Sequence, residues 1–135
     1  MTAALVLIPL LVISDQLSST FIKSFVGRPR PCYVLPPDQI HLIVGCGGLS
    51  FPSSHAVNNF GIATMFSYYY PKLKVWLFAF ASIVALSRVF VGVHYPSDVI
   101  GGAVIGTCIG AFVVWCWQSL SKRYFPALAV ERSAA

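Results

Sequence analysis

The chain has 135 residues, of which 57% are hydrophobic and 10% are charged, and its formal net charge is +5. Soluble domains are usually about 45–50% apolar and about 25% charged, so this composition excludes an ordinary soluble protein. The basic residues form no stripe, so we expect no nucleic-acid partner. The apolar residues fall into separated blocks, which predicts an all-α transmembrane helical bundle forming a single domain, residues 1–135.

The first predicted helix covers residues 3–26. Its start lacks the basic flank and the small-residue cleavage site of a secretory signal peptide, so we interpret it as a membrane segment. Asp15, Ser19 and Lys23 recur every four residues and therefore share one face. That face is expected to contact protein or water, because ionisable side chains are costly in lipid.

A long loop follows, residues 27–53, with five prolines and four glycines. Loops of this length are usually functional when they are ordered. Three further helices are predicted at residues 54–70, 72–91 and 96–120, which makes four in this chain. The second helix is capped by Ser53 or Ser54 and stopped by Pro71, and Pro96 suits the first turn of the last one.

Gly102, Gly106 and Gly110 recur every four residues on the last helix. Such a stripe lets another helix backbone approach closely. We favour packing inside the same bundle, and a homodimer face is the alternative.

If the helices alternate in direction, three polar clusters meet at one end of the bundle. They are the segment from Lys23 to Arg30, the start of the second helix at His55, and the turn from Arg88 through His94. Positioned cations and free helix N–H groups stabilise the charge that phosphoryl transfer spreads over oxygen. Two histidines add a nucleophile and a proton donor. This combination predicts phosphoryl transfer chemistry.

Each residue also has a plainer explanation when it is taken alone. Lys23, Arg28 and Arg30 could be interfacial anchors at a helix end. His55 and His94 could be ordinary helix-end residues, and Asp98 could complement its helix dipole. The joint spacing of these residues favours the catalytic interpretation.

That spacing resembles the type 2 phosphatidic acid phosphatase and vanadium haloperoxidase superfamily, in its bacterial lipid phosphatase branch. The first signature, Lys, six residues, then Arg-Pro, is met from Lys23 to Pro31. The second, Pro-Ser-Gly-His, is met at residues 52–55 with Ser54 in place of glycine. The third, Ser-Arg, five residues, His, three residues, Asp, is met from Ser87 to Asp98.

The resemblance implies that His94 is a nucleophile forming a phosphohistidine, that Asp98 orients it, and that His55 is the general acid. It also implies a set of phosphate-binding residues, with no metal ligand and no cofactor. These are Lys23, Arg30, Ser53, Ser54 and Arg88. Membrane members commonly have six spanning helices, and this chain matches the last four, so it is either truncated or a reduced bundle.

The positive-inside rule predicts the orientation in the bacterial inner membrane. Once the signature residues are set aside, Arg28 alone remains at the catalytic end. Five basic residues lie at the opposite end, namely Lys72, Lys74, Lys122, Arg123 and Arg132. We therefore expect the active site to face outward.

An outward site at lipid depth suits a lipid phosphate or diphosphate, with undecaprenyl diphosphate slightly ahead of phosphatidylglycerophosphate, phosphatidic acid and lipid A. An inactive truncated homologue, a non-catalytic membrane protein and a haloperoxidase are the alternatives.

Cys32 and Cys46 lie in the outward loop, where a disulfide can persist. The bridge and two free thiols are left open, whereas Cys108 and Cys116 on one helix are expected to stay reduced.

Overall fold

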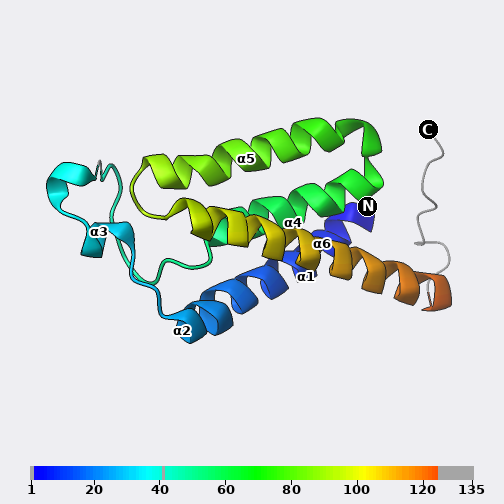
Figure 1. The fold of residues 1–135 in the computed structure, drawn as a ribbon. Helices are drawn as coiled ribbons and strands as arrows, with labels where there is room; N and C mark the ends of the chain where they lie inside the picture. The colour runs from blue at the N-terminus through cyan, green and yellow to red at the C-terminus, as the bar shows by residue number, and fades with distance from the viewer. Residues whose placement is uncertain (1, 41, 125–135) are drawn as a thin grey trace.

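The computed structural model of the chain describes residues 2–40 and 42–124, so Arg132 lies outside the described part. Every regular element in this part is helical, and four long helical segments run side by side (Figure 1). This confirms the predicted all-α bundle of four helices. Three helical stretches, residues 3–34, 71–90 and 96–124, are long and apolar enough to cross a membrane.

The first long segment consists of three joined pieces. Helix α1 covers Thr2–Asp15, a π-helical stretch covers Gln16–Ile22, and α2 covers Lys23–Val26. The segment ends at Gly27, whose backbone has a φ of 63° and donates an N–H bond to the Lys23 carbonyl. Only glycine adopts that left-handed conformation without strain, so Gly27 terminates the helix and turns the chain into the loop.

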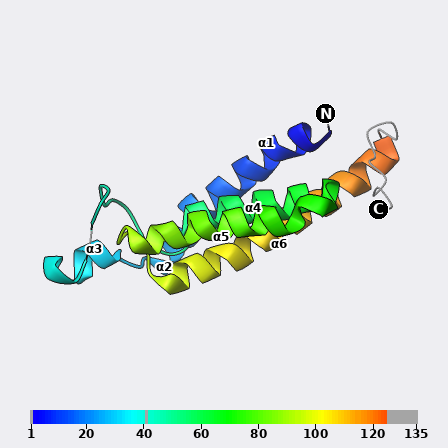
Figure 2. The same ribbon diagram turned by 90° about the horizontal axis from the view of Figure 1, so that it is seen from above.

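Helix α4, Ser54–Tyr69, lies at the centre of the bundle, and α1, α5 and α6 pack around it (Figure 2). Pro71 begins a 3₁₀ turn at Pro71–Leu73, so α5 starts two residues after the predicted position and covers Lys74–Phe90. Helix α6 covers Pro96–Tyr124 and extends four residues beyond the predicted end. Lys122 and Arg123 therefore lie in the last turn of α6.

The glycine stripe of α6 packs against α4 of the same chain, as predicted. A Cβ added at Gly102 would lie 2.8 Å from the Ser53 carbonyl oxygen, and one at Gly106 would overlap the carbonyl of Val57. A Cβ at Gly110 would lie 2.6 Å from the Gly61 carbonyl oxygen. The stripe therefore brings the two helix backbones into close contact.

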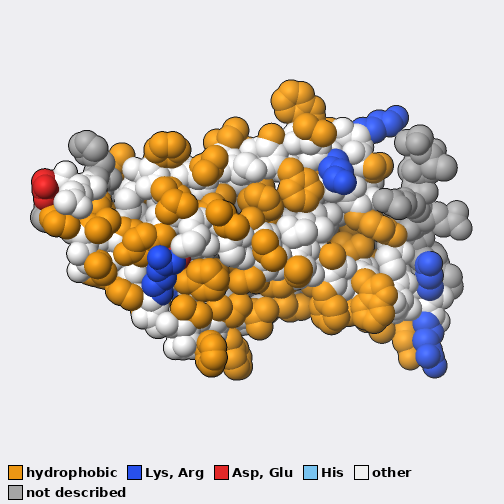
Figure 3. All heavy atoms as spheres, in the orientation of Figure 1, with side chains coloured by type: hydrophobic (Ala, Val, Ile, Leu, Met, Phe, Trp, Pro, Cys, Tyr) orange, Lys and Arg blue, Asp and Glu red, His pale blue; other side chains and the backbone are white. Residues whose placement is uncertain are grey.

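The outer surface is strongly apolar between two polar ends. Figure 3 shows hydrophobic side chains covering the middle of the visible face, with basic side chains toward both ends. Large side chains on this surface are exposed, including Phe25 at 92% and Phe90 at 79%. Exposed apolar groups of this size fit contact with lipid. The aromatic and basic ends fit contact with the two membrane interfaces.

The loop between α2 and α4 contains two short helical turns, α3 at Pro31–Val34 and a 3₁₀ turn at Pro37–Gln39. Cys32 and Cys46 form a disulfide, with their Cα atoms 6.6 Å apart, so the structure selects the bridge over two free thiols. Cys108 and Cys116 are free, as expected. The bridge joins α3 to the later part of the loop.

Candidate active site

A cavity of about 330 Å³ opens at the loop end of the bundle. It collects residues from α2, the loop, the start of α4, the end of α5 and the turn before α6. Six of the eight predicted site residues line it, namely Lys23, Arg30, Ser54, His55, Arg88 and His94. Ser53 and Asp98 do not line the cavity, because both side chains are fully buried behind it.

The cavity wall offers several donors to an anion. Lys23, Arg30 and Arg88 contribute the cations, and the Nε atom of Arg30 is buried without a hydrogen-bond partner among the described residues. The first N–H bonded within α4 is that of Val57, which donates to the Ser53 carbonyl at 3.0 Å. The amides of the preceding turn therefore point out of the helix end, where an anion is favoured by the free N–H groups and by the helix dipole.

Ser53 has a different position from the other predicted phosphate ligands. Its N–H donates to the backbone oxygen of Asp98 at 3.1 Å, which joins the start of α4 to the start of α6. Its Oγ is buried and unpaired within the described part of the chain. Ser53 thus fixes the two helix ends against each other at the base of the site.

His94 is buried, with 4% of its surface exposed, in the turn between α5 and α6. Burial first, and the positive charge of Arg30 second, lower the pKa of His94 to about 4. The nearby Asp98 carboxylate opposes this shift without cancelling it. His94 is therefore a neutral imidazole near pH 7, which is the form that can attack phosphorus.

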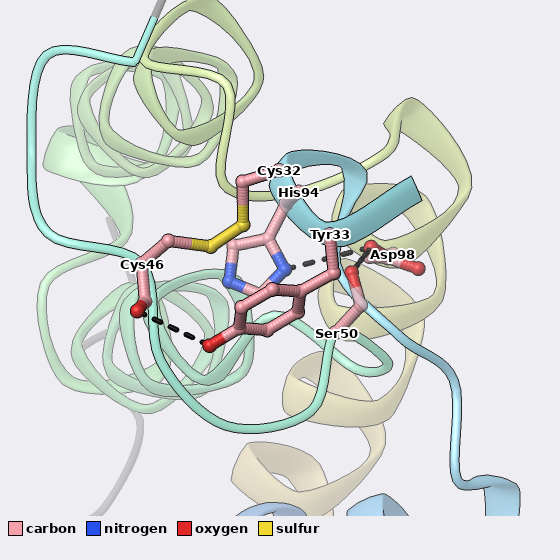
Figure 4. The surroundings of a disulfide bond; sticks show 6 residues. All are labelled: Cys32, Tyr33, Cys46, Ser50, His94 and Asp98. Carbon is pink, nitrogen blue, oxygen red and sulfur yellow. Dashed lines mark hydrogen bonds and ion pairs between the residues drawn. A yellow bond between two sulfur atoms is a disulfide. The ribbon is translucent and has the colours of Figure 1, made fainter. Parts of the chain in front are cut away.

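Asp98 lies one helical turn after His94, and its Oδ2 atom is 3.5 Å from the Nδ1 atom of the imidazole. This separation is longer than an ordinary hydrogen bond, and catalytic hydrogen bonds commonly shorten when substrate binds. Figure 4 shows the carboxylate facing the Nδ1 edge of the ring. The arrangement leaves Nε2 as the ring atom available for attack.

Three further groups hold the Asp98 carboxylate. Arg28 Nη1 donates to Oδ1 at 2.8 Å, the backbone N–H of Tyr95 donates to Oδ2 at 2.9 Å, and Ser50 Oγ donates a short bond to Oδ2. The sequence analysis gave Ser50 no role and treated Arg28 as an unassigned charge. The sequence offered one electrostatic signal: a buried carboxylate needs a cation beside it, and Arg28 is the arginine at this end of the bundle that the signatures do not use.

The disulfide lies beside this site. Tyr33, next to Cys32, donates from its hydroxyl to the Cys46 carbonyl at 3.2 Å, as Figure 4 shows. Val44 and Gly45, just before Cys46, line the cavity. The bridge therefore ties one wall of the cavity to the segment that carries Arg30.

Two other cavities have different linings. One of about 540 Å³ is bordered by Thr64, Phe78 and Trp115 among others and contains none of the predicted site residues. Another of about 340 Å³ shares His94 and is largely apolar. Among the described residues, no group of three or more His, Cys, Asp or Glu side chains is placed to hold a metal ion.

The sequence that forms this cavity matches a known protein family. Residues 4–122 match the model of the PAP2 superfamily. The chain belongs to the PAP2 superfamily. The resemblance read from the three signatures is thereby confirmed, and each of the three signatures contributes residues to the cavity lining.

Several PAP2 relatives are similar over most of this chain. Lipid A 4'-phosphatase of Bacteroides thetaiotaomicron is 34% identical over 116 residues, which cover 82% of this chain and 52% of that protein. The crystal structure of Aquifex aeolicus LpxE has a TM-score of 0.67 and 31% identity, covering 84% of this chain and 66% of that one.

The crystal structure of a transmembrane PAP2-type phosphatidylglycerolphosphate phosphatase from Bacillus subtilis also has a TM-score of 0.67. Its identity is 26%, and the match covers 89% of this chain and 61% of that one. The chain spans about half the length of the curated relatives it matches.

Proposed function

We propose that this chain is the catalytic part of a membrane phosphatase that hydrolyses a lipid phosphate or diphosphate without a metal ion. The observation that carries the proposal is the cavity in which Lys23, Arg30 and Arg88 surround His55 and His94. Such a cavity provides a nucleophile, a proton donor and fixed positive charge in one place. Those are the groups that phosphoryl transfer requires.

In the first step, Nε2 of neutral His94 attacks phosphorus while the bond from phosphorus to the lipid oxygen breaks. His55 gives its proton to the departing oxygen, so the lipid leaves as an alcohol, or as a monophosphate when the substrate is a diphosphate. The product is a phosphohistidine at His94. Lys23, Arg30 and Arg88 stabilise the charge on the transferring oxygens, which is the task that metal ions perform in other phosphatases.

In the second step, water attacks the phosphohistidine and the bond between nitrogen and phosphorus breaks. His55, now neutral, accepts the proton of the water, and inorganic phosphate leaves. His55 is exposed whereas His94 is buried, which suits a residue that exchanges protons with solvent. Asp98 holds the Nδ1 proton of His94 throughout and keeps Nε2 as the reacting atom.

The position of the cavity supports a lipid phosphate as the substrate. It opens at the end of an apolar bundle, so a phosphate carried on a membrane lipid can reach it from the bilayer surface. Undecaprenyl diphosphate remains the best candidate substrate from the sequence. The relatives named above add lipid A and phosphatidylglycerophosphate as candidate substrates to be tested beside it. We place the site on the outer face of a bacterial inner membrane.

The test is release of inorganic phosphate by the protein in detergent, measured in parallel on undecaprenyl diphosphate, phosphatidylglycerophosphate and lipid A. We expect release from at least one lipid, persisting in excess EDTA and blocked by vanadate. His94→Ala should abolish it. Activity that is lost on chelation and restored by magnesium would reject the metal-free mechanism, and no release from any lipid would reject the proposed function.

A further inference from the structure

Arg28 lies two residues before Arg30, yet the two arginines have different surroundings. Arg30 lines the cavity, whereas Arg28 is absent from its lining and turns toward the start of α6. There its Nη1 donates to Ser97 Oγ at 2.7 Å and to Asp98 Oδ1 at 2.8 Å. Its guanidinium carbon lies 4.0 Å from the centre of the Tyr95 ring.

We propose that Arg28, together with Ser50, is a positioning residue that fixes the Asp98 carboxylate so that Nδ1–H of His94 keeps its acceptor. This proposal rests on the proposed function, because it concerns the same nucleophile. Neither residue belongs to the three signatures described above. Both act through Asp98 and not on the phosphate.

The two oxygens of the Asp98 carboxylate have different partners. Oδ1 receives the charged donor Arg28, and Oδ2 receives Ser50 and the Tyr95 N–H while facing His94. A carboxylate held at both oxygens cannot rotate about its bond to Cβ. The acceptor for Nδ1–H therefore stays in one place, and outer partners of this kind orient the residue that they contact.

Arg28 contributes a positive charge as well as a hydrogen bond that orients the Asp98 carboxylate. Asp98 is fully buried, and burying a carboxylate costs free energy unless a cation pairs with it. The ion pair with Arg28 therefore stabilises Asp98 in the position where it faces His94. Arg28 is 36% exposed and is the cation that pairs with Asp98 among the described residues.

The same contacts join the two ends of the long loop to the nucleophile. Arg28 begins the loop and Ser50 lies near its end, and the Ser50 N–H donates to the Arg28 carbonyl at 2.8 Å. Both then bond to Asp98. The loop must therefore be closed at its base before Asp98 is held, which couples loop closure to the orientation of His94.

The first experiment compares Arg28→Gln, Arg28→Lys and Ser50→Ala with Arg123→Gln as a matched control. Arg123 also lies over a tyrosine ring, that of Tyr124, at the opposite end of the bundle. With nitrophenyl phosphate, we expect Arg28→Gln to lower kcat by about 10–100-fold with KM changed less than twofold. Arg28→Lys should recover most of that loss, and Arg123→Gln should match the parent protein.

The second experiment does not depend on turnover. Nitrogen NMR of protein labelled at histidine, with the His94 signals assigned by their loss in His94→Gln, should show the tautomer protonated at Nδ1 in the parent protein. Arg28→Gln and Ser50→Ala should each increase the fraction protonated at Nε2. If Arg28→Gln does not fold, the Ser50→Ala variant decides by the same two measurements.

Three results would overturn the positioning role. One is a raised KM with unchanged kcat in Arg28→Gln, which would make Arg28 a phosphate ligand. Another is a kcat equal to that of Arg123→Gln, and the third is an unchanged His94 tautomer in both variants. If the parent protein hydrolyses no substrate, the proposed function fails while the NMR result still judges the role of Arg28.

Discussion

His94 combines two environments that act on its charge in opposite directions. Burial and the charge of Arg30 favour the neutral ring, whereas Asp98 favours the protonated one. Burial and Arg30 have the larger effect, so the pKa of His94 falls to about 4. The ring thus keeps a carboxylate neighbour, which orients it, without becoming a cation. A neutral nucleophile beside an oriented Nδ1–H is the state that the proposed reaction needs.

This balance predicts the acid limb of the pH profile. The neutral form of His94 attacks, so kcat/KM should stay level as the pH falls from 6.5 to 5 and decline tenfold per unit only below about pH 4. The measurement is kcat/KM on nitrophenyl phosphate, corrected for ionisation of the substrate, with circular dichroism confirming the fold at each pH. A limb centred near 6.5, the ordinary histidine value, would contradict it.

His55 should reveal its role through the leaving group. His55→Ala should slow hydrolysis of a lipid phosphate by about 100-fold or more, because an alkoxide leaves poorly without a proton. Nitrophenolate leaves without assistance, so the first step on nitrophenyl phosphate should be much less affected. The burst of leaving group in rapid-quench experiments, nitrophenolate or the lipid alcohol, isolates that step, and equal losses on both substrates would show that His55 is not the donor.

The spacing of charged residues carries most of what could be predicted about the site. Lys23, Arg30, His55 and His94 come together because helix ends that alternate in direction must meet, which sequence can indicate. Arg28 and Ser50 could not be assigned in the same way. Their partner is a carboxylate whose complete burial depends on how α4, α6 and the loop pack, and no local pattern records that packing.

Among the elements, α4 and α6 form the rigid base of the site. The two helices approach through the glycines of α6, and the Ser53 N–H donates to the Asp98 carbonyl where they begin. His55 follows this junction on α4, and His94 precedes it before α6. A change in the distance between the helices would therefore change the distance between His55 and His94.

Gly106→Ala tests the close approach of α4 and α6. The added Cβ would overlap the Val57 carbonyl, which is backbone and cannot rotate away, so we expect a loss of about 1–3 kcal/mol of stability. Alanine is otherwise the better helix former, so a loss would be due to packing. Thermal unfolding in detergent measures it. Gly47→Ala is the control because its Cβ would meet nothing within 4 Å, and equal unfolding temperatures would refute the argument.

Helix boundaries follow local signals where those signals are strong. Proline at Pro71 and Pro96 and glycine at Gly27 each mark an end or a start that the sequence indicates. The π-helical stretch at Gln16–Ile22 has no such signal, so the sequence predicted a plain helix in its place. Helix α3 does begin with a proline, Pro31, but it is a single turn of four residues inside a segment rich in proline and glycine, so the sequence predicted a plain loop there.

At the scale of the whole molecule, charge and cysteine chemistry lead to the same proposed orientation. Apart from the cavity residues and Arg28, the described basic side chains lie at the far ends of α5 and α6, namely Lys72, Lys74, Lys122 and Arg123. Cytoplasmic ends carry such an excess. The disulfide lies at the other end, and disulfides persist in oxidising compartments outside the cytoplasm. Both observations support an outward site.

The last prediction concerns the disulfide between Cys32 and Cys46 and the side of the membrane on which it lies. Closing a loop of this size stabilises the fold by about 3 kcal/mol in the chain-entropy model, so the bridge should resist mild reductants in the folded protein. In unreduced membranes, we expect Cys108 and Cys116 to react with an alkylating reagent after detergent treatment, and Cys32 and Cys46 to react only after reduction. Mass spectrometry of the labelled peptides distinguishes the pairs.

Sidedness is read in the same experiment with a reagent that does not cross the inner membrane. After reduction of spheroplasts, Cys32 and Cys46 should become labelled without permeabilisation, because the proposed orientation places their loop outside. Labelling of Cys32 that requires permeabilisation would reverse the orientation, and free alkylation of both thiols before reduction would remove the bridge. A Cys32→Ser variant, whose partner Cys46 should react without reduction, is the control that the reagent reaches this loop.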